Sequence, residues 1–250
     1  MRADREGTAV TRIARGFDLD AAHAHLRKAD RALARWLRRL EPIGPQPRWR
    51  QRFDVTDALA RAILFQQLSG KAAATIVGRV EVATASKLLH ADSFARVDDA
   101  TLRSCGVSGN KTLALRDLSA RATRGEIPGL QQMAAMTDAQ IIAALSAVRG
   151  IGPWTVQMML MFRLGRPDVL PVDDLGIRKG AQIVDGLQAM PTPKQLLARG
   201  AAWAPFRTLA SLYLWRIVDT GDPADAAKLI SANGRAAVAK QKKPVPRSQG

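Results

Sequence analysis

Cysteine is almost absent from this chain, since Cys105 is the single one in 250 residues. A disulfide framework, a cysteine zinc site and a cysteine-ligated iron–sulfur cluster are therefore all excluded. The three histidines, His23, His25 and His90, are scattered and suggest neither a metal site nor a catalytic triad. No apolar run reaches the roughly 20 residues that span a membrane, and the first residues do not form a signal peptide. We therefore expect a cytoplasmic protein of the bacterial cytosol or nucleoid, with no membrane partner.

Acidic residues are also in short supply. The chain has 22 of them against 38 lysines and arginines, a formal charge of +16. A surplus of this size attracts polyanions such as nucleic acids, although a protein from an Arg-rich proteome would carry it too. Residues 231–250 contain five basic residues and no acid, so we expect a disordered basic tail, which either attracts DNA or is a solvated terminus. Residues 1–17 are expected to form a flexible basic arm.

Alternating β-rich runs of strand length are missing, and no repeat is visible, so the predicted fold class is all-α. The apolar spacing predicts helices at 18–40, 57–67, 71–83, 98–105, 108–123, 154–162, 196–203 and 205–218, with another that begins at 175. The connections around Pro47 and Pro167 are natural crossovers between two helical lobes. We expect residues 55–165 to form one lobe, and residues 18–54 with 166–225 the other.

A glycine turn, Gly150-Ile-Gly152, separates two of these apolar segments. Upstream, Thr137 and Gln140 have the form of a capping box; downstream, Pro153 stands at a favoured first helical position. Residues 139–163 are therefore predicted to form helix, short hairpin, helix. Glycines leave the backbone N–H groups uncovered, and the second helix points its positive end the same way, an arrangement that binds phosphate. An ordinary helical hairpin with a glycine cap is the alternative.

Residues 148–161 (VRGIGPWTVQMMLM) are followed, after Pro171, by Val-Asp173-Asp174. Together with 62–76 and 102–128, in this order, they resemble the helix-hairpin-helix (HhH-GPD) DNA glycosylases of base excision repair. The resemblance covers roughly residues 55–220 and is strongest to the DNA-3-methyladenine glycosylase II type. The bacterial relative of this type has an extra N-terminal β domain. Here the residues before 55 are predicted to be helical, so we expect that domain to be lacking.

The resemblance implies that Asp174 is the catalytic carboxylate, stabilising the oxocarbenium-like sugar as the N-glycosidic bond breaks. A carboxylate at a helix start is favoured as the anion, although either Asp173 or Asp174 can instead be a plain N-cap. We assign no role to Asp173 beyond capping. Relatives that also cut the strand carry a lysine where this chain has Trp154, so the resemblance implies a monofunctional enzyme without lyase activity.

The resemblance also implies a pocket for a flipped base, formed by Gln66, Trp154, Met158 and Trp215. Aromatic faces replace the stacking that an extruded base loses, and electron-rich rings suit the electron-poor alkylpurines. Met158 stands where the bacterial relative has tyrosine, so one stacking wall differs. Trp215 is surrounded by apolar residues at helical spacing and can alternatively be a core residue.

The family's plug falls on the break between two predicted helices. Gln67 is expected to fill the gap left by the flipped nucleotide, with Leu68 wedged beside it, while Ser69 and Lys71 reach the DNA backbone. An exposed polar loop is the alternative. The implied phosphate contacts of the hairpin are Arg149, Gly150, Gly152 and Thr155. A monovalent cation, Na⁺ or K⁺, is implied on the carbonyl groups of Ser146, Val148 and Gly150.

These expectations favour a monomeric, monofunctional DNA glycosylase that excises alkylated purines such as 3-methyladenine and 7-methylguanine from double-stranded DNA, and that requires no cofactor. Two alternatives remain: a glycosylase for deaminated, oxidised or etheno bases, and a catalytically silent helix-hairpin-helix DNA-binding protein.

Overall fold

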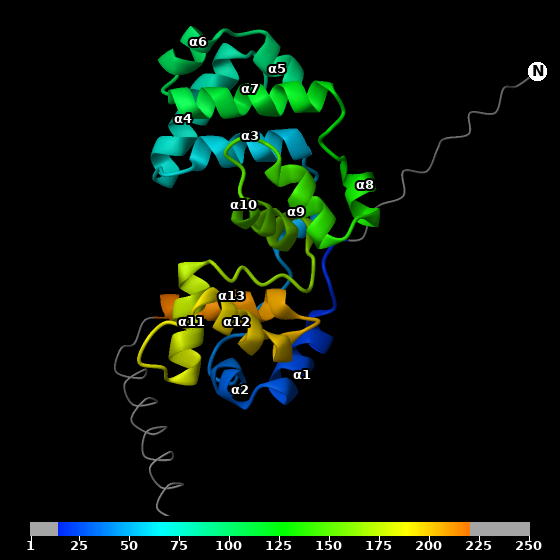
Figure 1. Ribbon diagram of the computed structural model, residues 1–250, viewed down its shortest axis with the longest axis vertical. Coiled ribbons are helices and arrows are strands. Elements are labelled where there is room, and N and C mark those ends of the chain that lie inside the picture. The colour runs from blue at the N-terminus through cyan, green and yellow to red at the C-terminus, as the bar shows by residue number, and fades with distance from the viewer. Residues whose placement is uncertain (1–14, 221–250) are drawn as a thin grey trace, which may run out of the picture. The chain divides into compact units, whose positions relative to one another are not determined.

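The computed structural model describes residues 15–220, and within this range every regular element is helical (Figure 1). The all-α prediction is confirmed for this part of the chain. None of its helices is long and apolar enough to cross a membrane. Residues 1–14 of the expected basic arm and all of the expected tail, 231–250, lie outside the described residues.

The chain divides into two compact units, each assembled from two stretches of sequence. Among the described residues, the first unit contains 15–16 and 46–165, and the second contains 17–45 and 166–220. We describe each unit by itself.

The first unit is built around two long helices that lie side by side, α3 (Val55–Phe65) and α7 (Gly109–Thr123) (Figure 1). Leu59 and Ile63 from α3 and Leu115 and Leu118 from α7 are fully buried, which makes this pair the centre of the unit's apolar core. Its other elements are η1 (Pro47–Arg50), α4 (Gly70–Ala83), α5 (Ala91–Ala95), α6 (Asp99–Ser104), α8 (Leu130–Ala135), α9 (Asp138–Ser146), α10 (Pro153–Met159) and η2 (Leu160–Leu164).

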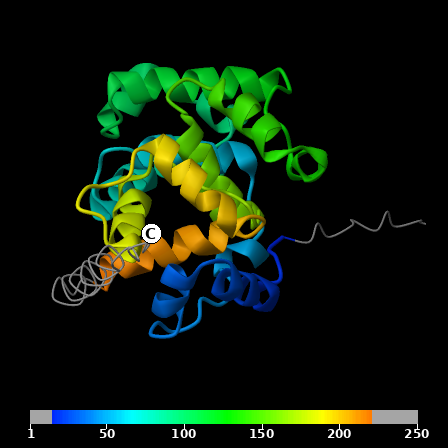
Figure 2. The same cartoon turned by 60° about the horizontal axis from the view of Figure 1, so that its bottom comes forward.

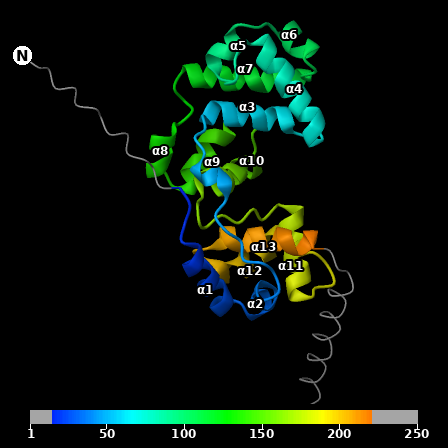
Figure 3. The ribbon, with the colours of Figure 1, turned by 180° about the vertical axis from the view of Figure 1, so that it is seen from behind.

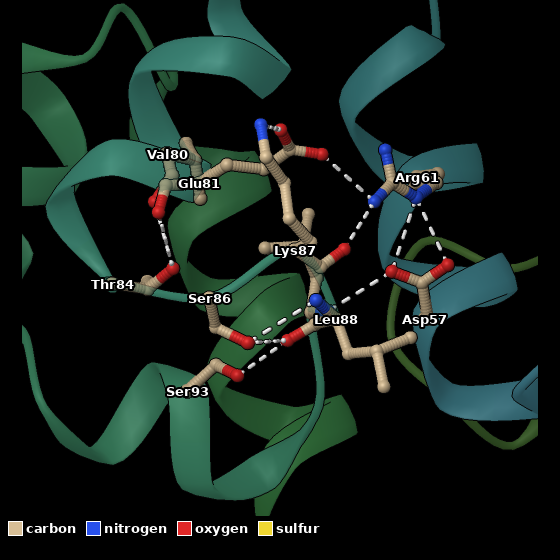
Figure 4. Close-up of polar contacts among 10 residues, drawn as sticks. Asp57, Arg61, Val80, Glu81, Thr84, Ser86, Lys87, Leu88 and Ser93 are labelled. Atoms are coloured by element: carbon tan, nitrogen blue, oxygen red, sulfur yellow. Dashed lines mark hydrogen bonds and ion pairs between the residues drawn. The ribbon is translucent and has the colours of Figure 1, made fainter.

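A group of ion pairs ties α3 to the end of α4 (Figure 4). Arg61 contacts Asp57 one turn earlier on α3 and Glu81 on α4, each at 2.9 Å. Glu81 also pairs with Lys87 at 2.8 Å, although Lys87 itself is 87% exposed. Burial alone would lower the pKa of Arg61, but the hydrogen bonds and charges of its two acidic partners raise it. The network therefore connects α3 with the end of α4 and the segment that follows it.

The second unit packs five helices and one 3-10 turn around helix α13 (Arg207–Asp219) (Figures 2 and 3). The other elements are α1 (Leu19–Ala29), α2 (Arg31–Leu37), α11 (Leu175–Asp185), α12 (Pro193–Arg199) and η3 (Gly200–Trp203). Helices α11 and α13 lie very close, because a Cβ atom added to Gly180 would come within 2.4 Å of the Leu214 carbonyl oxygen. Glycine is therefore required at this helix crossing.

The prediction of one helix over 18–40 is wrong. Asp30 interrupts it with an extended backbone, φ −138° and ψ 103°, and its carboxylate caps α2 through the amides of Ala32 and Leu33. The same carboxylate accepts the indole N–H of Trp203 and pairs with Arg199. Burial by itself would raise the pKa of Asp30, but these donors and charges outweigh it and lower the pKa. The contacts of the buried Asp30 carboxylate therefore decide the backbone conformation here, in spite of the helical periodicity of the sequence.

The expected boundary at residue 54 is also wrong, because residues 46–54 belong to the first unit. Trp49 is the reason. Its side chain is 5% exposed, and its indole N–H donates to the Met161 carbonyl oxygen at 2.7 Å. This hydrogen bond anchors η1 against η2.

Several boundaries differ from the sequence-based expectation. The helix expected over 154–162 is α10, which passes into the π-helical turn η2 and ends at Gly165 with φ 63°. The helix expected over 196–203 is α12 followed by the 3-10 turn η3. The short helices α5 and α8 were not predicted. The capping box of Thr137 and Gln140 and the N1 position of Pro153 are confirmed.

Candidate functional site

The side chains of Asp174 and Trp215 meet in the second unit, where α11 begins against α13. Oδ1 of Asp174 accepts the backbone N–H of Ile177 and the indole N–H of Trp215, each at 2.8 Å. The first bond makes Asp174 the N-cap of α11, and the second comes from a residue 41 positions later. These two N–H donors fix the orientation of the carboxylate at the start of the helix.

Glycine at position 176 makes this contact possible. A Cβ atom added there would lie 2.8 Å from Cδ1 and 3.0 Å from Nε1 of Trp215. Any larger residue would push the indole away from the carboxylate. Trp215 is thus neither a plain core residue nor a free surface residue: it is partly buried and engaged by Asp174.

Asp173 does not have the capping role that we expected for it. The cap of α11 is Asp174, while Asp173 is exposed and stands one residue before it. The N-cap and the implied catalytic carboxylate are therefore the same residue, and the two interpretations of Asp174 are compatible.

The hairpin between α9 and α10 has the predicted geometry. Gly150 adopts φ 77°, in the left-handed region that favours glycine, and the amide of Ile151 closes the turn on the Val148 carbonyl oxygen at 3.0 Å. Gly152 has an ordinary φ of −95°, and a Cβ atom there would meet nothing within 4 Å. Gly152 is thus not demanded by packing or by the backbone, and its missing side chain leaves the start of α10 open to a ligand.

One expected donor of the hairpin is already engaged. The backbone N–H of Thr155 donates to the Gly152 carbonyl oxygen at 3.0 Å within the first turn of α10, which leaves its hydroxyl group for the expected phosphate contact. The backbone N–H of Arg149 donates to Oδ2 of Asp117 on α7 at 2.8 Å, while the residue itself is exposed. Arg149 can therefore meet a phosphate through its guanidinium group, and Thr155 through its hydroxyl group.

Gln66 contacts the hairpin directly, because its side-chain Nε2 donates to the Gly150 carbonyl oxygen at 2.8 Å. Two of the three carbonyl groups suggested as cation ligands thus have a donor already, since that of Val148 accepts Ile151 N–H. A carbonyl oxygen retains a second lone pair, and the end of helix α9 concentrates partial negative charge here. The Ser146 hydroxyl oxygen in the same turn is buried without a hydrogen-bond partner among the described residues. The chemistry of this turn therefore fits a small cation.

The loop between α3 and α4 is strained at the residue expected to act as the plug. Gln67 has φ 56°, a left-handed conformation that non-glycine residues rarely adopt. Gln67 and Leu68 are both exposed, Leu68 by 40%. Ser69 caps α4 through the Ala72 amide at 3.3 Å, and Lys71 is exposed on its first turn. A strained backbone next to an exposed apolar side chain is unusual in a loop that only connects two helices, and it is typical of a functional loop.

Trp154 and Met158 lie one turn apart on α10 and so share a face of that helix. Trp154 is 48% exposed, an unusually large open aromatic surface, whereas Met158 is partly buried. Of the residues expected to line the base pocket, these two and Gln66 belong to the first unit, and Trp215 belongs to the second. Trp49 and Trp203, which were assigned no role at the site, are both buried core residues.

Comparison with known proteins identifies this arrangement. The HhH-GPD superfamily base excision DNA repair protein family matches residues 60–205, more than half of the chain. The chain belongs to the HhH-GPD superfamily.

Relatives of this chain have names that refer to the repair of 3-methyladenine in DNA. The chain is 34% identical over 167 residues to DNA-3-methyladenine glycosylase 1 of Schizosaccharomyces pombe, covering 66% of this chain and 73% of the relative. It is 32% identical over 173 residues to a putative DNA-3-methyladenine glycosylase of Bacillus subtilis, covering 67% of this chain and 60% of that relative.

Solved HhH-GPD structures have the same fold. The S. pombe enzyme, determined in complex with abasic DNA, matches with a TM-score of 0.68 and 32% identity, covering 78% of this chain and 95% of that one. A DNA-3-methyladenine glycosidase from Bacillus halodurans matches with a TM-score of 0.71 and 33% identity, covering 80% and 90% of the two chains.

Three residues that matter to this HhH-GPD site were not found from the sequence: Gly176, Lys111 and Asp117. The Gly176-x-x-x-Gly180 spacing was a usable signal, because two small residues one turn apart allow a neighbouring helix to approach closely. The roles of Lys111 and Asp117 depend on contacts with segments far along the chain, and no local pattern encodes them.

Proposed function

We propose that this HhH-GPD protein is a monofunctional DNA glycosylase that removes alkylated purines, of the 3-methyladenine and 7-methylguanine type, from double-stranded DNA. The observation that carries the proposal is the Asp174–Trp215 hydrogen bond at the start of α11. A protein that only binds DNA gains nothing from an oriented carboxylate, because a carboxylate repels phosphates. The names of the relatives support the choice of alkylated purines.

Asp174 supplies the charge for bond cleavage. As the base departs, C1′ of the deoxyribose becomes oxocarbenium-like, and a carboxylate held in a fixed orientation stabilises that positive charge. Water then attacks C1′, its proton is lost to the surroundings, and the products are the free base and an abasic site. Electron-poor N-alkylated purines are good leaving groups, so carboxylate stabilisation alone suffices for them.

The first unit supplies the residues that bind the DNA backbone. The N–H groups of Gly150 and Gly152, with the side chains of Arg149 and Thr155, bind a backbone phosphate at the positive end of α10. Gln67 and Leu68 enter the duplex from the minor groove and replace the extruded nucleotide, while Ser69 and Lys71 contact the flanking backbone. Both the DNA-binding residues and the carboxylate belong to one chain, so we propose that it acts as a monomer.

The base pocket combines stacking with selectivity. The exposed face of Trp154 offers an electron-rich surface to a cationic alkylpurine, with Met158 one turn away as an adaptable apolar contact. The Gln66 side chain keeps a second amide hydrogen and its carbonyl oxygen for the edge of the base, while Trp215 in the second unit holds Asp174. Trp154 cannot form a Schiff base, so no strand cleavage accompanies base release.

A monovalent cation at the hairpin would be held by the carbonyl groups of Ser146, Val148 and Gly150. Its positive charge would strengthen phosphate binding by the neighbouring N–H groups.

The test is base release from methylated duplex DNA followed by chromatography of the free bases. We expect release of 3-methyladenine and 7-methylguanine, with the DNA strand intact until alkali cleaves the abasic sites. Tight DNA binding without release of any base would instead identify a silent DNA-binding protein. Release of hypoxanthine or etheno bases alone would identify a glycosylase for another class of lesion.

A further inference from the structure

Lys111, on helix α7, reaches the carboxyl end of helix α3. Its Nζ donates to the carbonyl oxygens of Leu64 and Gln66, each at 2.8 Å. Lys111 forms no ion pair with any residue that the structure describes. Burial lowers the pKa of this lysine. Burying part of an ammonium group without a carboxylate partner costs free energy, and the two hydrogen bonds to backbone carbonyl groups offset part of that cost.

Those contacts hold the residue immediately before Gln67. The left-handed backbone of Gln67 is strained for a residue with a side chain, and it persists only where neighbouring contacts determine it. Lys111 fixes the carbonyl group of Gln66, and the Gln66 side chain is fixed in turn by the Gly150 carbonyl oxygen at 2.8 Å. The strained residue is thus held by its predecessor.

Helix α7 also holds the hairpin. Oδ2 of Asp117 accepts the Arg149 amide at 2.8 Å, and Asp117 pairs with Arg121 at 3.0 Å. Burial alone would raise the pKa of Asp117, but the Arg149 hydrogen bond and the Arg121 charge lower it. One helix therefore anchors both the loop and the hairpin through side chains, and Gln66 joins the two directly.

We propose that Lys111 is a positioning residue that presets the loop Gln66–Ser69 relative to the hairpin, so that plug insertion and phosphate binding occur together. It acts through Gln66 and touches neither base nor sugar. This inference rests on the proposed function, because it assigns the loop the work of stabilising an extruded nucleotide. Without Lys111, the loop would become ordered only when a nucleotide is extruded. The entropy cost of that ordering would then weaken binding to DNA with an extruded nucleotide.

Lys111 should affect the binding of DNA from which a nucleotide is extruded, and not the binding of DNA in general. We therefore compare the Kd for a duplex with a tetrahydrofuran abasic analogue with the Kd for the same undamaged duplex. Lys111→Met removes the donors while keeping an unbranched side chain of similar length. We expect it to lower the preference for the abasic duplex about tenfold, the effect of losing hydrogen bonds from a charged group, with the Kd for undamaged DNA within about twofold.

Two further variants separate positioning from general destabilisation. Lys87→Met changes an exposed lysine of the same unit and should leave the preference unchanged. Lys111→Arg retains donors for the two carbonyl groups and should recover part of the preference. If the Met variant does not fold, Lys111→Gln, which removes the charge but keeps an amide donor on a shorter side chain, should show a smaller loss in the same direction. An equal loss of affinity for both duplexes would reduce Lys111 to a structural residue and overturn the proposal.

A double-mutant cycle tests the route of action. If Lys111 acts only through the plug loop, adding Lys111→Met to Gln67→Ala should not lower the preference further. Fully additive effects would contradict the inference. If the wild-type protein neither releases alkylated bases nor prefers abasic DNA, the proposed function itself is wrong. If the wild type does both and Lys111→Met keeps the preference for abasic DNA, only the role assigned to Lys111 is wrong.

Discussion

The indole N–H of Trp215 lies 2.8 Å from the same carboxylate oxygen of Asp174 that caps helix α11. One residue therefore begins a helix, orients an aromatic side chain and presents a negative charge. The geometry depends on Gly176, because only a residue without Cβ leaves room for the indole. Changes at these three positions should affect catalysis and stability in different ways.

Trp215→Phe should keep a ring in place and remove only the donor to Asp174. A hydrogen bond to a charged group contributes about 1.5–3 kcal/mol, so we expect kcat for 3-methyladenine release to fall at least about tenfold. Single-turnover kinetics at saturating enzyme measure this directly. Trp36→Phe, in the same unit, is the matched control. An unchanged rate in Trp215→Phe would show that the bond does not orient the carboxylate for catalysis.

Gly176→Ala should impair activity although alanine favours helix. Its Cβ would press on the Trp215 ring at 2.8 Å and displace it from Asp174. The matched control is Gly78→Ala in α4, where a Cβ meets nothing within 4 Å and the substitution should raise the free energy of unfolding by about 0.5–1 kcal/mol. Chemical denaturation and base-release assays of both variants check the prediction. It fails if Gly176→Ala gains stability as Gly78→Ala does and retains full activity.

Gln67→Gly should make the protein more stable and less selective for DNA from which a nucleotide is extruded. Glycine adopts φ 56° without the penalty of roughly 1–2 kcal/mol that glutamine pays there, but it cannot fill the gap in the duplex. Gln67→Ala removes the same side chain while leaving most of the backbone strain. Thermal unfolding should therefore separate the two variants, while the affinity for abasic DNA should fall in both. Equal melting temperatures would refute the strain argument.

The sequence predicts those features of the structure that depend on residues close together in the chain. The Thr137–Gln140 capping box, Pro153 and the Gly150 turn obey rules that involve only a few neighbouring residues, and all three are confirmed. The break at Asp30 is set by Trp203 and Arg199, which lie 173 and 169 positions away. Helical periodicity around Asp30 carries no trace of those partners, so a continuous helix was the wrong prediction.

The candidate site follows the same division. Asp174 and the hairpin are recognisable from motif order, because each is a short segment with fixed spacing. The hydrogen bond from Trp215, the role of Gly176 and the contacts of Lys111 arise from helix packing over distances of 39 to 47 residues along the chain. Aromatic residues among aliphatic ones look like core until the partner of their N–H group is known.

The wild-type protein should release bases without cutting the strand. Trp154 stands at the second position of α10, where an indole has no nucleophilic amine to form a Schiff base with the sugar. Borohydride treatment during the reaction should therefore trap no covalent protein–DNA complex, and nicking should appear only after alkali. A trapped complex would contradict the monofunctional mechanism and point to another amine in the chain.

The most direct test of the central claim is the single-turnover rate of 3-methyladenine release by Asp174→Asn. Asparagine caps helices as well as aspartate and is nearly isosteric, so folding and the Kd for abasic DNA should change little. The rate should fall at least about 100-fold, the loss expected when one stabilising group for transition-state charge is removed. Asp173→Asn, one residue earlier and exposed, should retain the wild-type rate. Release by Asp174→Asn at the wild-type rate would contradict the account.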